Sequence, residues 1–163
     1  MLTLTLDELL TYTHEERSKW QDWFRAHPSA FDLRLQPDGR FATVAALVDH
    51  IFLVEARHLA RLRREPVPDA SGVPPGDGEA LFAYADQIRR ALSAYISALA
   101  PDDAAATREF AVQSGTVRMT PRKLLFHIGL HEIRHWAQIA IGVRQGGLTP
   151  PGNHDLFYSR ALE

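Results

Sequence analysis

Residues 120–145 read TPRKLLFHIGLHEIRHWAQIAIGVRQ, and this stretch determines the organisation that we predict for the whole chain. It has the marks of one long helix. Thr120 can cap the start through its side-chain hydroxyl, and Pro121 suits the first helical position. Gly146 follows the last predicted turn, where a glycine commonly ends a helix. We therefore expect an uninterrupted helix of about seven turns.

This helix carries histidines at four-residue steps: His127, His131 and His135. At about 100° per residue they lie on one face, where two neighbouring imidazoles can bind one metal ion. His127 and His135 are about 12 Å apart along the axis, so one ion takes a neighbouring pair and needs a further ligand from another segment. A single histidine is more often a hydrogen-bonded core residue than a ligand. Burying three imidazoles costs free energy unless each has a polar partner. A cation shared between them is such a partner, which favours a metal site.

Length and composition limit the class of protein. The 163 residues predict one domain, residues 1–163, with a core large enough to fold unaided. A formal net charge of −2 gives no strong field for nucleic acid or an anionic membrane, so we expect neither partner. There is no basic leader, and no apolar run reaches the ~20 residues of a membrane span, which predicts a cytoplasmic protein. The chain has no cysteine, so a metal must use nitrogen and oxygen ligands, and a thiol must come from a cofactor or substrate.

Three further stretches repeat apolar residues at three- and four-residue steps, and each begins with a residue that can cap a helix. These stretches are residues 5–26, 43–65 and 77–99, with Thr5, Thr43 and Asp77 as the caps. Between Phe110 and Met119, apolar and polar residues alternate around Ser114 and Gly115, which predicts a short hairpin before the last helix. The predicted fold class is all-α, a four-helix bundle, and its long connections leave room for a crossover along the bundle.

Histidines outside the last helix are candidates for the missing ligand. His50 lies near the middle of the second predicted helix, well placed to complete a site with a pair from the last one. His58 and Glu55 are further polar candidates close to the same face. We expect His58 to lie in the core or to hydrogen-bond to a metal ligand. We expect Glu55 to be solvated or to hydrogen-bond to a ligand in the same way. His14 lies beside the buried stripe of the first helix and is more simply interpreted as a flanking residue.

The last predicted helix is apolar nearly all round, which is unusual for a helix with one exposed face. Away from the histidines it carries Phe126, Ile133, Trp136, Ala137 and Ala140. A second buried face is therefore expected, most simply a homodimer interface through this outer face.

Residues 131–135, HEIRH, match the HExxH motif of zinc metallopeptidases, in which the glutamate polarises a water molecule. The longer metzincin form of the motif fails, because Gln138 and Ile141 stand where a glycine and a third histidine belong. Other zinc peptidases need a downstream glutamate, and only Glu163 remains. A zinc hydrolase of this type is therefore a minor alternative.

The order and spacing of these features resemble the DinB/YfiT-like superfamily over nearly the whole chain. Its members carry a single histidine in an L-x-x-H-x-x-x-x-E-type run on the second helix, which residues 47–55 match. Their last helix carries H-x-x-x-H followed by a glutamine, which residues 131–138 match, although the usual H-R-G-Q is H-W-A-Q here. The resemblance implies a four-helix bundle whose metal ligands are His50, His131 and His135. His127 would then lie next to the metal site without binding the ion.

Characterised members of this superfamily include metal-dependent transferases and isomerases that use low-molecular-weight thiols such as bacillithiol or mycothiol. The resemblance implies a thiol-dependent S-transferase or isomerase here, with one divalent ion (zinc, nickel or iron) and a small-molecule substrate. Three imidazoles would leave positions on the ion open, as catalysis needs. Glu132 is the candidate catalytic residue, either as a general base or by orienting a ligand. The alternative is a non-catalytic metal-binding protein with a stress-response role, or a structural dimer.

Overall fold

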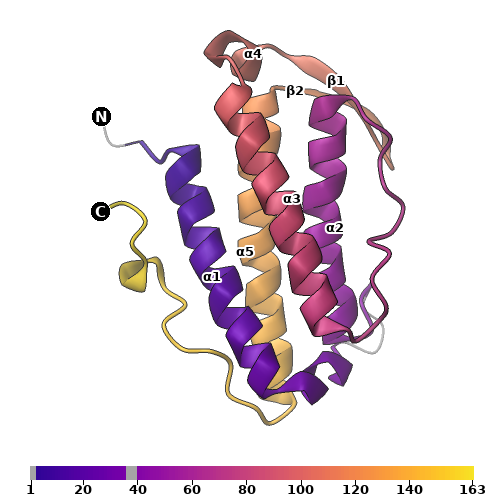
Figure 1. Cartoon of the computed structure of the whole chain (residues 1–163), viewed down its shortest axis with the longest axis vertical. Coiled ribbons are helices and arrows are strands. Elements are labelled where there is room, and N and C mark those ends of the chain that lie inside the picture. Colours follow the sequence, from indigo (N-terminus) through magenta and orange to yellow (C-terminus); the bar gives the residue numbers. More distant parts are fainter. Residues whose placement is uncertain (1–2, 36–39) are drawn as a thin grey trace.

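The computed structural model describes residues 3–35 and 40–163 and shows long helices packed side by side (Figure 1). The all-α four-helix bundle is confirmed, and each predicted helix end holds to within two residues. The long helices are α1 (Leu6–Ala26), α2 (Val44–Arg63), α3 (Gly78–Ala98) and α5 (Pro121–Gln145). A bilayer-spanning segment is absent from the described helices.

Side-chain caps fix where the long helices begin. The Thr5 hydroxyl accepts a hydrogen bond from the Glu8 backbone N–H, and the Glu8 carboxylate accepts one from the Thr5 backbone N–H, which completes a capping box. Thr43, Asp77 and Thr120 each accept a hydrogen bond from a backbone N–H of the first turn that follows. Such caps contribute about 0.5–2 kcal/mol each, so the helix starts are local properties of the sequence.

The connections set the directions of the helices. In Figure 1, α1 and α5 run one way and α2 and α3 run the other way, because residues 64–77 return along the length of the bundle. Arg57 ties this return segment to α2 by donating hydrogen bonds to the carbonyl oxygens of Pro68 and Asp69. The predicted crossover is thus present.

Smaller elements close the two ends of the bundle. The predicted hairpin is confirmed as two antiparallel strands that follow a short helix after α3, and a 3-10 turn links α1 to the segment before α2. After α5 the chain returns beside α1 (Figure 1), where Trp23 Nε1 donates a hydrogen bond to the carbonyl oxygen of Thr149. These elements are η1 (Pro28–Asp32), α4 (Pro101–Ala105), β1 (Arg108–Val112), β2 (Gly115–Met119) and η2 (Leu156–Tyr158).

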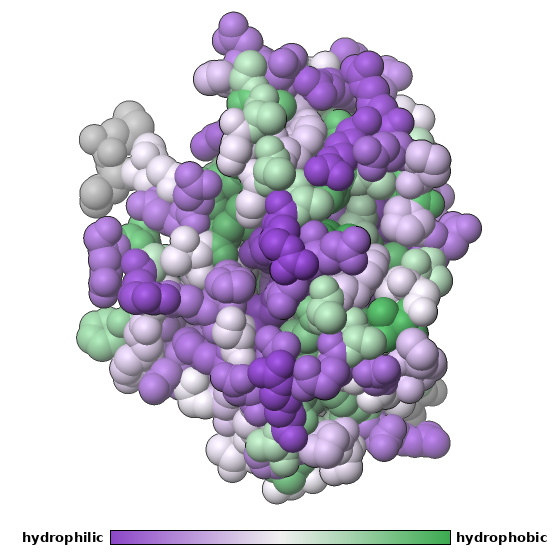
Figure 2. Space-filling view, in the orientation of Figure 1, coloured by the Kyte–Doolittle hydropathy of each residue, from purple (hydrophilic) through white to green (hydrophobic). Residues whose placement is uncertain are grey.

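The core consists of two apolar clusters, one toward each end of the bundle. One is built around Trp20, Phe24, Phe52, Phe82 and Trp136, and the other around Leu10, Leu59, Leu92, Leu125 and Ile128. The outward sides of α1 and α3 are mostly hydrophilic, with apolar side chains scattered between them (Figure 2). The helices are therefore amphipathic in the predicted way.

Trp136 and Ala140 belong to the first of these clusters, which corrects the predicted outer face of the last helix. Trp136 is 3 % exposed and stacks on Trp20 with the ring centroids 5.3 Å apart. The reason is that α1 packs against the side of α5 that faces away from the histidines. Both residues are thus in the core of the chain and are not available to a partner.

A layer of charged side chains separates the two clusters, with one residue from each long helix. We call Arg17, Glu55, Arg89 and Glu132 the ionic quartet. Its side chains are at most 8 % exposed, and hydrogen bonds of 2.6–3.2 Å join the two guanidinium groups to the two carboxylates. Two positive and two negative charges cancel, so the layer keeps its charges paired inside the bundle.

Candidate metal site

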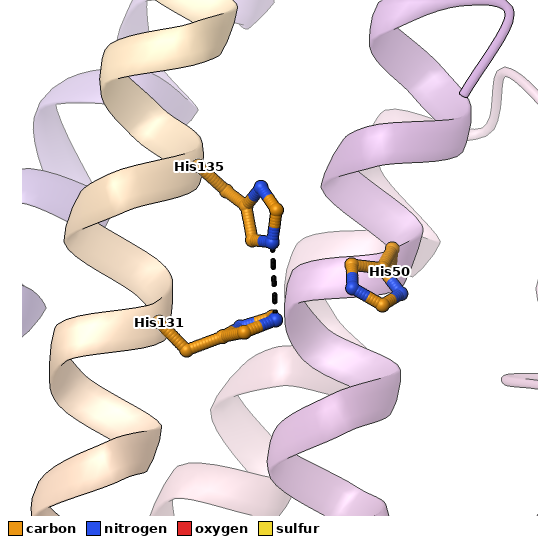
Figure 3. A group of neighbouring side chains, drawn as sticks. All are labelled: His50, His131 and His135. Atoms are coloured by element: carbon orange, nitrogen blue, oxygen red, sulfur yellow. Dashed lines mark hydrogen bonds between the residues drawn. The ribbon is translucent and has the colours of Figure 1, made fainter. Parts of the chain in front are cut away.

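Three imidazoles converge between α2 and α5 (Figure 3). His50 comes from α2, whereas His131 and His135 come from successive turns of α5. Each of them offers a ring nitrogen, and these three atoms lie within 4.8 Å of one another. The structure thus brings together the three predicted ligands, which we call the histidine triad.

Helix geometry explains this convergence. His131 and His135 are four residues apart, so their rings lie one above the other on the face of α5 that packs against α2. The ring of His50 lies 5.1 Å from that of His131 and 5.2 Å from that of His135, measured between centroids. Phe41 packs on the His50 ring at 4.5 Å and on the His135 ring at 6.1 Å, so an aromatic side chain limits how the two imidazoles can turn.

The nitrogen atoms are spaced as two ligands of one ion would be. Nε2 of His131 and Nε2 of His135 are 3.0 Å apart. Two nitrogens that each lie about 2.0–2.1 Å from one ion are separated by roughly 3.0–3.4 Å for ordinary coordination angles. The spacing therefore fits a shared divalent ion.

Gln138 sets the proton position on His135. Its side-chain oxygen lies 2.5 Å from Nδ1 of His135. Because an amide oxygen only accepts hydrogen bonds, Nδ1 carries the proton and donates it, and Nε2 keeps its lone pair for a metal. A hydrogen bond of this kind to the second ring nitrogen is typical of metal-ligating histidines.

The surroundings keep the triad neutral. Burial is the main cause that lowers the pKa of His50 to about 4 and that of His131 to about 2, and it also lowers the pKa of His135. The other residues that lower these pKa values are histidines and arginines, among them Arg40 and Arg134. Since zinc, nickel and iron bind the neutral form of imidazole, the donor set fits such an ion.

The remaining histidines lie outside the triad. His127 is exposed, and its ring lies 5.6 Å from that of His131 and 5.2 Å from that of His58, so it is a neighbour, as expected. His58 accepts a 3.4 Å hydrogen bond at Nδ1 from Arg61. His14 is exposed on α1.

Glu132 does not face the triad, which corrects its expected catalytic role. Arg17 and Arg89 both contact its carboxylate, and Trp136 Nε1 donates to Oε1 at 3.1 Å. The side chain is 2 % exposed. On a helix, residue 132 points about 100° away from residue 131, and here that direction is the core. The carboxylate that HExxH chemistry needs at the metal is therefore engaged elsewhere. Glu55, also considered a supporting candidate, lies in the same ionic quartet.

A cavity of about 280 Å³ adjoins the triad through His135. The segment before α2, the first turn of α2 and the C-terminal half of α5 form its walls. Its lining includes Phe41, Gln138 and the exposed Arg40. The triad thus has access to a space that can hold a small molecule.

Sequence reasoning missed the roles of Gln138 and Arg40 at the site and of the two arginines in the ionic quartet. Gln138 was detectable, because a residue three positions after His135 can reach the same face of the helix. Arg89 in the ionic quartet and Arg40 at the cavity gave no such signal, because their positions depend on how distant segments pack.

Comparison with known proteins assigns a family. The family model described as the DinB family matches residues 1–161. No curated protein shows significant sequence similarity to the chain. The match covers nearly the whole chain, including both helices that carry the triad. On this ground, the chain belongs to the DinB family.

Proposed function

We propose that the protein is a metal-dependent enzyme of the thiol-dependent S-transferase or isomerase type, acting on a small molecule. The observation that carries this proposal is the histidine triad beside a cavity: among the His, Cys, Asp and Glu side chains that the structure describes, three imidazoles form the group that could hold an ion. A structural ion is normally closed by four protein ligands, whereas a catalytic ion keeps a position for substrate.

The residues of the chain have distinct tasks in this proposal. His50, His131 and His135 hold one zinc, nickel or iron ion, and Gln138 keeps Nε2 of His135 free for it. When bound, the ion supplies stabilisation of a thiolate at neutral pH. The thiol comes from outside, because the chain has no cysteine. A low-molecular-weight thiol such as bacillithiol or mycothiol fits, and the cytoplasm keeps such thiols reduced.

A hydrolase of the HExxH type has less support. That mechanism needs a glutamate that activates water at the metal, and the Glu132 carboxylate is held by two arginines instead.

Activity with and without metal tests the proposal. Protein loaded with zinc, nickel or iron(II) is mixed with a low-molecular-weight thiol and an electrophilic acceptor, and S-conjugation is followed by mass spectrometry. We expect turnover that is lost when the metal is removed, lost in His131→Ala, and kept in His14→Ala, which alters an exposed imidazole outside the site. Metal binding without turnover for any thiol would favour the non-catalytic alternative.

We also propose a homodimer through the exposed side of α5. Apolar residues follow one another at three- and four-residue steps along this side: Phe126, Leu130, Ile133, Ala137 and Ile141. Leu130 is 56 % and Ile141 is 55 % exposed, which is unusual for large apolar side chains in one stripe. Sedimentation equilibrium should show a dimer that Leu130→Glu dissociates and Leu162→Glu, at another exposed leucine, leaves intact. A monomer mass independent of concentration would contradict it.

A further inference from the structure

The cavity beside His135 is lined by both apolar and polar side chains. Leu35, Leu47 and Ile141 are among the apolar ones. Its volume of about 280 Å³ lies at the lower limit of ordinary ligand pockets, which run from about 300 to 1,000 Å³. The space therefore suits a small molecule with a short apolar body.

The polar side chains of the lining offer hydrogen-bond donors. Arg40 lines the cavity with a guanidinium group, whose Cζ lies 5.4 Å from the centroid of the Phe41 ring. Phe41 in turn packs on His50, so the guanidinium rests on the same aromatic side chain that borders the triad. Gln138 uses its oxygen for His135, which leaves its amide N–H groups as donors.

Among the residues that the structure describes, the charged side chain that lines the cavity is an arginine. Arg40 lines this cavity together with His135, and the exposed Arg134 precedes His135 on α5. Three neutral imidazoles leave the double charge of a divalent ion uncompensated. A ligand that enters the cavity would therefore meet the ion and the Arg40 guanidinium, both positive, and an anion is favoured there.

We propose that the cavity binds a carboxylate carried by the small-molecule thiol, and that Arg40 is the residue that anchors it. The proposal rests on the proposed function, because the metal-bound end of the same ligand is the thiol. A guanidinium group presents two parallel N–H donors that match the two oxygens of a carboxylate. The apolar wall then contacts the carbon chain between the carboxylate and the sulfur.

Two thiols of matched length test the anchor: 3-mercaptopropionate, which carries a carboxylate, and 3-mercapto-1-propanol, which carries a neutral hydroxyl. Their dissociation constants are measured on the cobalt(II)-loaded protein from its visible absorption. We expect wild type to bind 3-mercaptopropionate at least about tenfold more tightly. Arg40→Gln should reduce this preference to less than about twofold while leaving the neutral thiol unaffected.

Arg122→Gln is the matched control. Arg122 is exposed on α5, and its guanidinium lies over the Phe126 ring at 5.0 Å, much as that of Arg40 lies over Phe41. This variant should keep the wild-type preference. Equal binding of both thiols to wild type, or a preference that survives in Arg40→Gln, would overturn the anchor.

The metal-free protein separates this inference from the proposed function. Both compounds are titrated into it and followed by NMR chemical shifts, where the sulfur has no ion to bind. Arg40 should still make 3-mercaptopropionate the tighter ligand in wild type, with the difference lost in Arg40→Gln. If neither thiol changes the cobalt(II) absorption, the proposed function fails, and this second titration still decides whether the anchor exists.

Discussion

The ionic quartet and the histidine triad lie next to each other in the bundle and are built in opposite ways. In the ionic quartet, each carboxylate meets both arginines, and the four charges cancel within the core. In the histidine triad, burial and arginines such as Arg40 and Arg134 lower the imidazole pKa values, so the rings are neutral, and a cavity lies alongside. The charges of the ionic quartet pair with one another, whereas the triad could hold a metal ion.

The motif HEIRH at residues 131–135 contributes to both clusters. His131 and His135 turn toward His50 of α2, and His135 also lines the cavity, while Glu132 turns into the core. The comparison teaches that a sequence motif identifies residue types, and that the direction of each side chain decides which chemistry they share. Stability should depend on the ionic quartet, and metal and ligand binding on the triad.

Removing a carboxylate from the ionic quartet should have the largest effect. Glu132→Ala leaves Arg17 and Arg89 buried with one carboxylate between them, and we expect the free energy of unfolding to fall by about 3–5 kcal/mol. Urea unfolding at neutral pH measures it. Glu79→Ala, which breaks the exposed ion pair with Arg25, is the control and should cost much less. Equal losses in the two variants would mean that the quartet adds no more than a surface pair.

The hydrogen bond behind His135 should have the next largest effect. Gln138→Ala removes the acceptor that fixes the proton on Nδ1, and we expect metal affinity to fall by about 10- to 100-fold with the fold unchanged. Competition with a metal chelator measures the affinity. Gln145→Ala is the control, because Gln145 lines the same cavity at its far end on α5. If both variants bind metal like wild type, Gln138 has no part in the site.

The pH dependence of stability should separate the clusters through smaller changes. In the metal-free protein, burial lowers the pKa of His50 to about 4 and that of His131 to about 2 from the ordinary 6.5. The unfolded chain then takes up protons first, so stability falls as the pH decreases below 6.5. Burial opposes ionisation of Glu55, but Arg17 and Arg89 outweigh it and lower its pKa from 4.5 to about 2. The stability that Glu55 contributes is present above pH 4.5 and is lost as the pH falls toward 2.

Urea midpoints measured from pH 7 to pH 3 test these two windows. Replacing His50 and His131 together by glutamine should reduce the loss between pH 6.5 and 4.5 and leave the part of the loss below pH 4.5 that comes from Glu55. A wild-type midpoint that stays constant down to pH 4.5 would contradict neutral, buried imidazoles.

Much of the fold could be predicted from the sequence because its determinants are local. Thr5, Thr43, Asp77 and Thr120 act within one turn of their own helices, and the apolar repeat gives the buried face of each. The triad was also accessible. The four-residue step between His131 and His135 supplies a pair, and the superfamily resemblance selects His50 as the third residue.

The remaining features depend on which helix faces pack against each other, and the residue spacing along one helix does not predict that. The ionic quartet contains one residue from each of four helices. The sequence around Glu132 therefore does not predict its ion pairs with Arg17 and Arg89. Trp136 was predicted to lie on the outer face of the last helix, but Trp20 of α1 covers it. Arg40 lies in a connection, where periodicity gives no direction.

Metal content tests the central claim most directly, that rings from α2 and α5 hold one ion. Untagged wild type, His50→Ala and His58→Ala are loaded with zinc, dialysed, and analysed for metal per chain, with circular dichroism as a check of the fold. His58→Ala is the matched control, a histidine of the same helix that lies outside the triad. We predict about one ion per chain in wild type and His58→Ala, and loss of the ion with an unchanged helical spectrum in His50→Ala. Wild-type zinc content in His50→Ala would contradict the account.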